Sequence, residues 1–182
     1  NIDVYFLERL LYTNPWVSKA EVYMSIQGTV EIEIEQRQPI LRIIREEGDS
    51  YYMDAAGRLM PWSGDYTPRV LLASGRISEK WEDWKQHSME EIINNDTLKT
   101  QTLLDDFYSM AQFILADEFW SAQVEQIYVN QMGEMELIPK AGEHRILFGT
   151  SDQMAEKFGN LRALYEEGLN HTGWEQYDTL NL

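Results

Sequence analysis

The chain has 182 residues, of which 43% are apolar and 12% aromatic, and this is enough to bury a core in one domain or two small ones, which excludes a wholly disordered chain. With 15 basic and 31 acidic residues, its formal net charge is −16, a field that opposes binding to nucleic acid or to an anionic membrane surface. The chain contains no cysteine, which excludes disulfides, thiol nucleophiles and zinc–thiolate sites but does not decide the compartment.

The chain opens with Asn1-Ile2-Asp3-Val4, without an initiator methionine or a basic leader. We therefore expect it to be a piece of a longer protein, and a removed signal peptide or anchor stays an open alternative. The longest uncharged apolar run is far shorter than the ~20 residues that a membrane-spanning helix needs.

The first forty residues predict one short helix and a β-hairpin. Apolar residues recur at helical spacing from Val4 to Leu11, and Asn14-Pro15 ends the helix. Apolar and polar residues then alternate over 19–26, and Gln27-Gly28 turns the chain into a second alternating run. In this second run three apolar residues alternate with glutamates, so we expect one buried and one solvated face. The residues expected to be buried are Val30, Ile32 and Ile34.

The following segments predict a domain in which strands are combined with two helices. We expect a linker near residues 36–45. Helical spacing predicts one helix over 98–119 and a last helix from Ser151, its capping residue, through Leu169. Strands 123–130, 134–139 and 144–148 are expected to form an antiparallel meander. The remaining strands are expected at 40–44, 50–54, 70–73 and 177–182, the last of which looks cut off in mid-course.

Residue patterns that carry enzyme chemistry are absent from the sequence. There is no glycine-rich phosphate loop, zinc-binding His-Glu-x-x-His pair, nucleophile elbow or calcium loop. His87, His144 and His171 lie far apart in sequence, and the paired carboxylates Glu90-Glu91 and Asp105-Asp106 point in different directions when they lie on a helix. We therefore expect no catalytic residue, no metal site and no cofactor.

Aromatic residues are concentrated at a few places along the chain. Trp81 and Trp84 are three residues apart and share one face of a helix, and further clusters occur at Phe119-Trp120 and Tyr51-Tyr52. Packing in the core is the more common role of such residues. A hot spot for a partner protein is the alternative that the spacing leaves open.

Four segments resemble a known family in their order along the chain. Residues 14–22 and 28–40 look like the second half of a POTRA module, and 51–57 resembles the tyrosine–aspartate–glycine hairpin that follows it in that family. Residues 144–150 match a later strand, which is followed by a helix with family-like residues. Those residues are Met154, Lys157, Phe158 and Leu161. Together these segments resemble the bacterial cell-division family FtsQ/DivIB, in the style of a Bacteroidetes-type member.

The resemblance implies an α+β fold in two parts. These are a partial POTRA domain (α-β-β) over residues 1–40 and an FtsQ-like β domain of antiparallel strands with two packed helices over 41–182. The first strand and helix of the POTRA unit are missing, so we expect its remaining sheet to be exposed. The β domain is also expected to be truncated at its C-terminal end.

The resemblance also implies a function without catalysis. Proteins of this family are divisome scaffolds on the periplasmic side of the bacterial inner membrane, held by a single N-terminal anchor and bound to the small bitopic proteins FtsB and FtsL. In the family an edge strand near the C-terminus accepts a strand of the partner. The partner-binding residues expected here are Tyr177, Asp178, Thr179, Leu180, Asn181 and Leu182.

An open strand edge needs no reactive side chain to bind a partner, because its backbone donors and acceptors are satisfied by an incoming strand. Two other interpretations stay open at this point. One is another POTRA-type assembly adaptor, which binds strands in the same way. The other is a secreted hydrolase whose carboxylates converge only in the fold.

Overall fold

The computed structural model describes residues 3–142, 144–169 and 178–182 of the chain. The helices are α1 (Val4–Leu11), α2 (Trp81–Trp84), α3 (Met89–Ile93), α4 (Asp96–Lys99), α5 (Leu104–Ala116), α6 (Glu118–Gln123), α7 (Met154–Ala163) and the π-helical turn η1 (Leu164–Leu169). The strands are β1 (Val17–Met24), β2 (Val30–Gln36), β3 (Pro39–Ile44), β4 (Ser50–Asp54), β5 (Leu59–Pro61), β6 (Leu71–Gly75), β7 (Val124–Val129), β8 (Met135–Pro139), β9 (Arg145–Gly149) and β10 (Thr179–Asn181).

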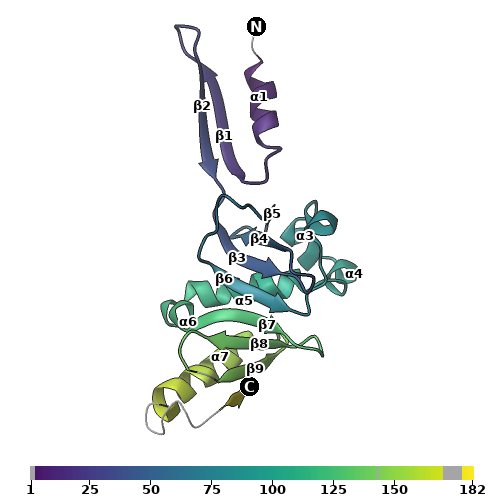
Figure 1. Ribbon diagram of the computed structural model, residues 1–182, viewed down its shortest axis with the longest axis vertical. Helices are drawn as coiled ribbons and strands as arrows, with labels where there is room; N and C mark the ends of the chain where they lie inside the picture. The colour runs from purple at the N-terminus through teal and green to yellow at the C-terminus, as the bar shows by residue number, and fades with distance from the viewer. Residues whose placement is uncertain (1–2, 143, 170–177) are drawn as a thin grey trace.

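The strands form two sheets. β1 and β2 make a hairpin of their own, and the other strands form an eight-stranded sheet in the order β10-β9-β8-β7-β6-β3-β4-β5. In Figure 1 the hairpin, with α1 alongside it, extends from one end of the molecule, and the larger sheet and its helices make up the body. The predicted α+β class is confirmed.

The N-terminal hairpin is covered by α1 on the β1 side alone. The helix is capped by Asp3 and is tied to β1 where the carboxylate of Glu8 accepts the N–H of Val22 at 3.0 Å. On β2, Ile32 and Ile34 are about half exposed. The prediction that this face of β2 is buried is therefore wrong, because α1 lies over β1 and no other described segment covers β2. The expectation that the remaining sheet of the partial POTRA unit is exposed agrees with this arrangement.

The larger sheet is mixed, whereas antiparallel strands were expected. The meander β7-β8-β9 is antiparallel as predicted. However, β6 runs parallel to both β3 and β7, and β10 runs parallel to β9. The cause lies in the connections: helices α2 to α6 occupy the chain between β6 and β7 and return it to the same end of the sheet, as a parallel pair requires.

Helices cover one face of this sheet. The inward side chains of β3, β6 and β7 are buried in one core with those of α5, and Figure 1 places α5 and α7 behind the strands. Phe158 of α7 stacks on Phe113 of α5, with ring centroids 4.6 Å apart, and also lies against Trp120 and Phe148. On the opposite face, a row of cross-strand neighbours is only partly buried. This row is Arg42, Leu72, Gln126 and Ile138.

A buried ion pair joins the hairpin to the larger sheet. Nη1 of Arg37 lies 2.6 Å from Oδ2 of Asp54, and the same guanidinium donates to the carbonyls of Pro15 and Val17. Trp16 packs edge-on against Tyr52 at this junction. The linker predicted near 36–45 is wrong in its extent, because two residues separate β2 from β3 and a strand occupies most of that range.

Two helix predictions also change in detail. The helix predicted over 98–119 is divided among α4, α5 and α6, because residues 100–103 form no helix and the backbone of Asp117 is extended. The last helix starts after Gln153 rather than at Ser151, whose hydroxyl instead donates to the carboxylate of Asp106. Within the described ranges, no helix has the length and apolar character needed to cross a membrane.

Candidate functional site

The C-terminal segment predicted to bind a partner forms one margin of the eight-stranded sheet. β10 pairs with β9 alone, with Thr179 opposite Arg145 and Asn181 opposite Leu147. Tyr177, the first residue of the predicted segment, lies outside the described residues. We refer to the outer side of β10, from Thr179 to Asn181, as the β10 edge.

Two hydrogen bonds determine which backbone groups of β10 face β9. The N–H of Arg145 donates to the carbonyl of Asp178 at 2.9 Å, and the N–H of Leu182 donates to the carbonyl of Leu147 at 3.2 Å. Backbone groups alternate in direction along a strand, so those of Leu180 also face β9. The N–H and C=O groups of Thr179 and Asn181 therefore point away from β9, where no described strand pairs with them.

The side chains anchor β10 without covering its outer edge. Leu180 is buried in the core and Leu182 packs against that core, whereas Thr179, Asn181 and Asp178 are exposed. The strand is thus held by apolar contacts on one face of the sheet. Its outward backbone groups do not contribute to that anchoring.

A shallow hollow lies over β7, β8 and the start of β9, the strand that pairs with β10, on the sheet face that the helices leave open. Its volume is about 410 Å³, and Arg145 at its rim is exposed. The guanidinium of Arg145 lies 3.6 Å from the carboxylate of Glu136, whose side chain is largely buried. The hollow is lined by Gln126, Tyr128, Ile138, Gly142, His144 and Arg145.

His144 belongs to the core rather than to a reactive site. Its Nε2 lies 2.7 Å from the hydroxyl of Tyr165, and the imidazole is 2% exposed. Burial lowers the pKa of His144 and raises the pKa of Tyr165 to about 12, so both groups are neutral at physiological pH. This pair fastens the start of β9 to the turn η1.

The opposite margin of the sheet is less suited to accepting a strand. β5 and β10 are equally short, with three residues each, but one residue of β5, Pro61, has no N–H to donate. Leu59 and Met60 are both buried. Proline in an edge strand is a common way of protecting a sheet edge, so β5 has fewer backbone donors for an incoming strand than β10 has.

The other polar residues considered from the sequence do not converge. His87 pairs with Glu91 at 3.2 Å, and His171 lies outside the described residues. Asp105 is buried with Lys99 3.8 Å away, whereas Asp106 accepts the hydroxyl of Ser151. Among the residues that the structure describes, no group of three or more histidines and carboxylates is arranged to hold a metal ion.

Trp81 and Trp84 lie on α2, as their spacing predicted, and both are half-buried against the core. The ammonium group of Lys85 lies over the ring of Trp81, 4.5 Å from its centroid. The core interpretation of this pair therefore agrees with the structure better than a free hot spot does.

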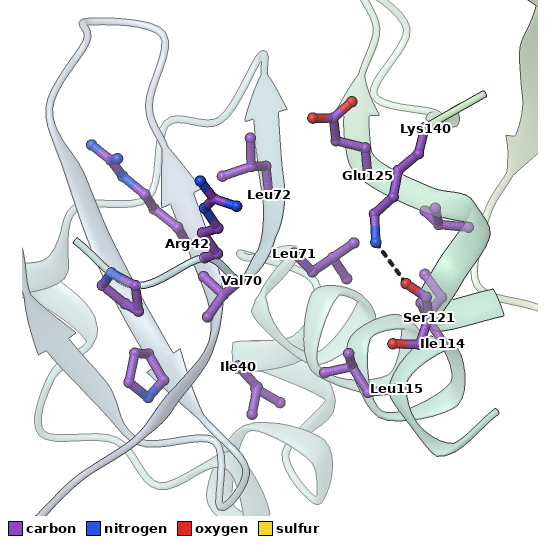
Figure 2. Close-up of a pocket in the computed structure, with 14 residues that line it drawn as sticks. Ile40, Arg42, Val70, Leu71, Leu72, Ile114, Leu115, Ser121, Glu125 and Lys140 are labelled. Carbon is purple, nitrogen blue, oxygen red and sulfur yellow. Dashed lines mark hydrogen bonds between the residues drawn. The ribbon is translucent and has the colours of Figure 1, made fainter. Parts of the chain in front are cut away.

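Sequence reasoning missed a cavity that lies where β6 and β7 begin. Its volume is about 800 Å³. Figure 2 shows Arg42 on one side of it and Lys140 on the other, with Leu71 and Leu115 between them. No sequence motif indicates this site, because its residues come from β3, β6, β7, the end of β8 and two helices.

Comparison with known proteins finds one family. A family model described as FtsQ/DivIB, C-terminal related, matches residues 38–182. This range contains the whole eight-stranded sheet and leaves out α1, β1 and β2. No curated protein matches the chain.

Proposed function

The chain belongs to the FtsQ/DivIB, C-terminal related family, and from that premise we propose that it is a non-catalytic scaffold that recruits other division proteins by strand addition. Membership of this family associates it with cell division. FtsQ/DivIB proteins have no catalytic activity of their own in that process, so binding is the activity to be explained.

The β10 edge is the proposed docking site, and one observation carries this proposal. The backbone groups of Thr179 and Asn181 point outward at the end of the sheet, while Leu180 anchors the strand in the core. An extended segment of a partner can complete those hydrogen bonds without any rearrangement of the sheet.

The partners that we propose are small bitopic division proteins of the FtsB and FtsL kind. We place the chain on the periplasmic side of the inner membrane, where a single anchor preceding it in the full-length protein would hold it. We also propose two functional parts, a partial POTRA domain over residues 1–40 and the β domain over 41–182. The interlocked contacts of Arg37 and Asp54 would make these parts move together.

Photocrosslinking in living cells tests this proposal directly. A photoreactive amino acid is placed in the full-length protein at Thr179 or Asn181, and at Thr97, an exposed residue of α4, as the control. We expect positions 179 and 181 to crosslink to a small bitopic division protein, and position 97 to give no such product. Equal crosslinking from all three positions, or products without a division protein, would contradict the proposal.

A further inference from the structure

The cavity between β6 and β7 arises because these strands diverge at one end. β3 pairs with β6 from Leu41 and Leu71 onward, but β6 pairs with β7 only from Leu72 and Gln126 onward. β7 also has an irregularity between Val124 and Gln126 in its pairing with β8. The sheet is therefore open at this end, and the cavity of about 800 Å³ extends over the opening. We refer to it as the β6–β7 cavity.

The walls of the β6–β7 cavity are mostly apolar and come from both the sheet and α5. Leu115, near the end of α5, is 40% exposed although the helix is otherwise packed in the core. Ile40 and Val70 of the opposite wall are also only partly buried. Apolar side chains that remain accessible inside a concave site favour an apolar ligand group. The rest of the apolar lining comes from Pro39, Pro68, Leu71, Leu72, Ile114 and Val124.

Three cations also line the β6–β7 cavity, against one carboxylate, that of Glu125. This is the reverse of the whole chain, in which acidic residues outnumber basic ones by 31 to 15. Nζ of Lys140 donates to the carbonyl of Ser121 at 2.7 Å (Figure 2). Arg42 donates to the hydroxyl of Ser50 at 3.1 Å.

Arg69 is exposed and makes no side-chain hydrogen bond or ion pair with any described residue. None of the three cations lies within ion-pair distance of a carboxylate among the residues that the structure describes. The cavity thus combines an apolar interior with three cations that form no ion pair with the residues that the structure describes.

We propose that the β6–β7 cavity docks a segment of a partner protein that carries a large apolar side chain flanked by carboxylates. The apolar walls accept the side chain, and Arg69 and Lys140 at the rim pair with the acids. An anionic membrane surface fits less well, because the net charge of −16 repels a broad anionic surface. The same charge matters less for a short segment that lies inside a locally positive site. The cavity is separate from the β10 edge, since β8 and β9 lie between them. Binding at the cavity therefore does not depend on strand addition at β10.

The experiment uses a phage-displayed library of random short peptides, selected against the wild-type chain. Enriched peptides are then synthesised with a fluorescein label, and their affinities are measured by fluorescence anisotropy. The test variant is Arg69→Glu/Lys140→Glu, and the matched control is Arg76→Glu/Lys80→Glu, which reverses two exposed cations elsewhere on the surface. A second test variant, Leu115→Gln, changes the apolar wall and no charge. Circular dichroism verifies that every variant is folded.

We expect enriched peptides to place aspartate or glutamate beside leucine, phenylalanine or tryptophan. Their affinity should fall about tenfold or more in the Arg69→Glu/Lys140→Glu variant and in Leu115→Gln, and it should stay unchanged in the control variant and in Thr179→Pro. Peptides without acidic residues, or peptides that bind the test variants as well as wild type, would overturn the proposal. It would also be overturned if vesicles of phosphatidylglycerol, and no peptide, bound through Arg69 and Lys140.

Discussion

The N–H of Leu182 donates to the carbonyl oxygen of Leu147 over 3.2 Å. With the bond from Arg145 to Asp178 at the other end of the strand, it directs every second residue of β10 toward β9. The intervening residues, Thr179 and Asn181, are left with their backbone groups facing outward. Inward and outward positions can therefore be separated by mutation.

Proline at position 179 should separate partner binding from stability. Thr179→Pro removes one outward N–H and leaves the bonds to β9 in place, so the thermal midpoint should change little while capture of the partner in pull-down falls. Thr179→Ala keeps the N–H and should bind as wild type does. Leu180→Pro removes an inward N–H and a buried side chain, and should lower the midpoint. If Thr179→Pro destabilises the protein as much as Leu180→Pro, β10 is a structural strand only.

Replacement of Arg37 should weaken the whole molecule. Arg37→Met leaves the carboxylate of Asp54 buried without its cation, which typically costs about 3–5 kcal/mol. The free energy of unfolding from urea titration measures this loss. Arg37→Met/Asp54→Asn should recover part of it, because the second change removes the unpaired charge. No recovery in the double variant would mean that the hydrogen bonds of Arg37 to Pro15 and Val17 dominate instead.

Asp105→Asn should leave the protein as stable as wild type or make it more stable at neutral pH. Burial raises the pKa of Asp105, and the nearby charge of Asp106 adds to the effect. A carboxyl whose pKa is raised by folding favours the folded state when it is protonated, and this contribution is lost as the pH rises from its unfolded pKa through its folded pKa. The stability of Asp105→Asn relative to wild type should therefore be lower in acid than at neutral pH. Thermal melts of both proteins between acid and neutral pH test this sign. A thermal midpoint of the variant below that of wild type at neutral pH would contradict the prediction.

Two glycine substitutions should differ sharply in cost. Gly75 has a φ of +102°, and a Cβ there would lie 2.2 Å from the carbonyl oxygen of Val129 on the neighbouring strand. Gly28 has a φ of +83° with no atom within 4 Å of its Cβ position. Gly75→Ala should therefore lose several kcal/mol and Gly28→Ala about 1 kcal/mol, as measured by urea unfolding. Equal losses would mean that β6 and β7 can move apart at this point.

Much of the local structure could be predicted from residue periodicity. Alternation located β1, β2 and the meander of β7 to β9, and three- and four-residue spacing located α5. These patterns succeed because each element buries one side of itself, and that side is visible in the sequence. The end of α5 was placed too late because Asp117, which caps α6, occurs within the same apolar pattern.

The long-range features could not be obtained in this way. The parallel pairing of β6 with β7 depends on where the chain returns after its helices, which periodicity does not encode. The burial expected for Ile32 was wrong because it depends on the reach of α1. Similarly, Arg69 and Lys140 lie far apart in sequence, and only the opening between β6 and β7 brings them to one cavity.

The ladder between β6 and β7 also has a consequence for folding kinetics. The β3–β4 hairpin and the β7–β8–β9 meander are each made from neighbouring segments and can nucleate independently, whereas β6 meets β7 only after the chain from Gly75 to Val124 has been traversed. We expect the pairing of β6 with β7 across this long connection to be a slow step of folding. A chain cleaved between α3 and α4 would yield two fragments that keep their own hairpins, and reassociation of those fragments would isolate this step from the rest of folding.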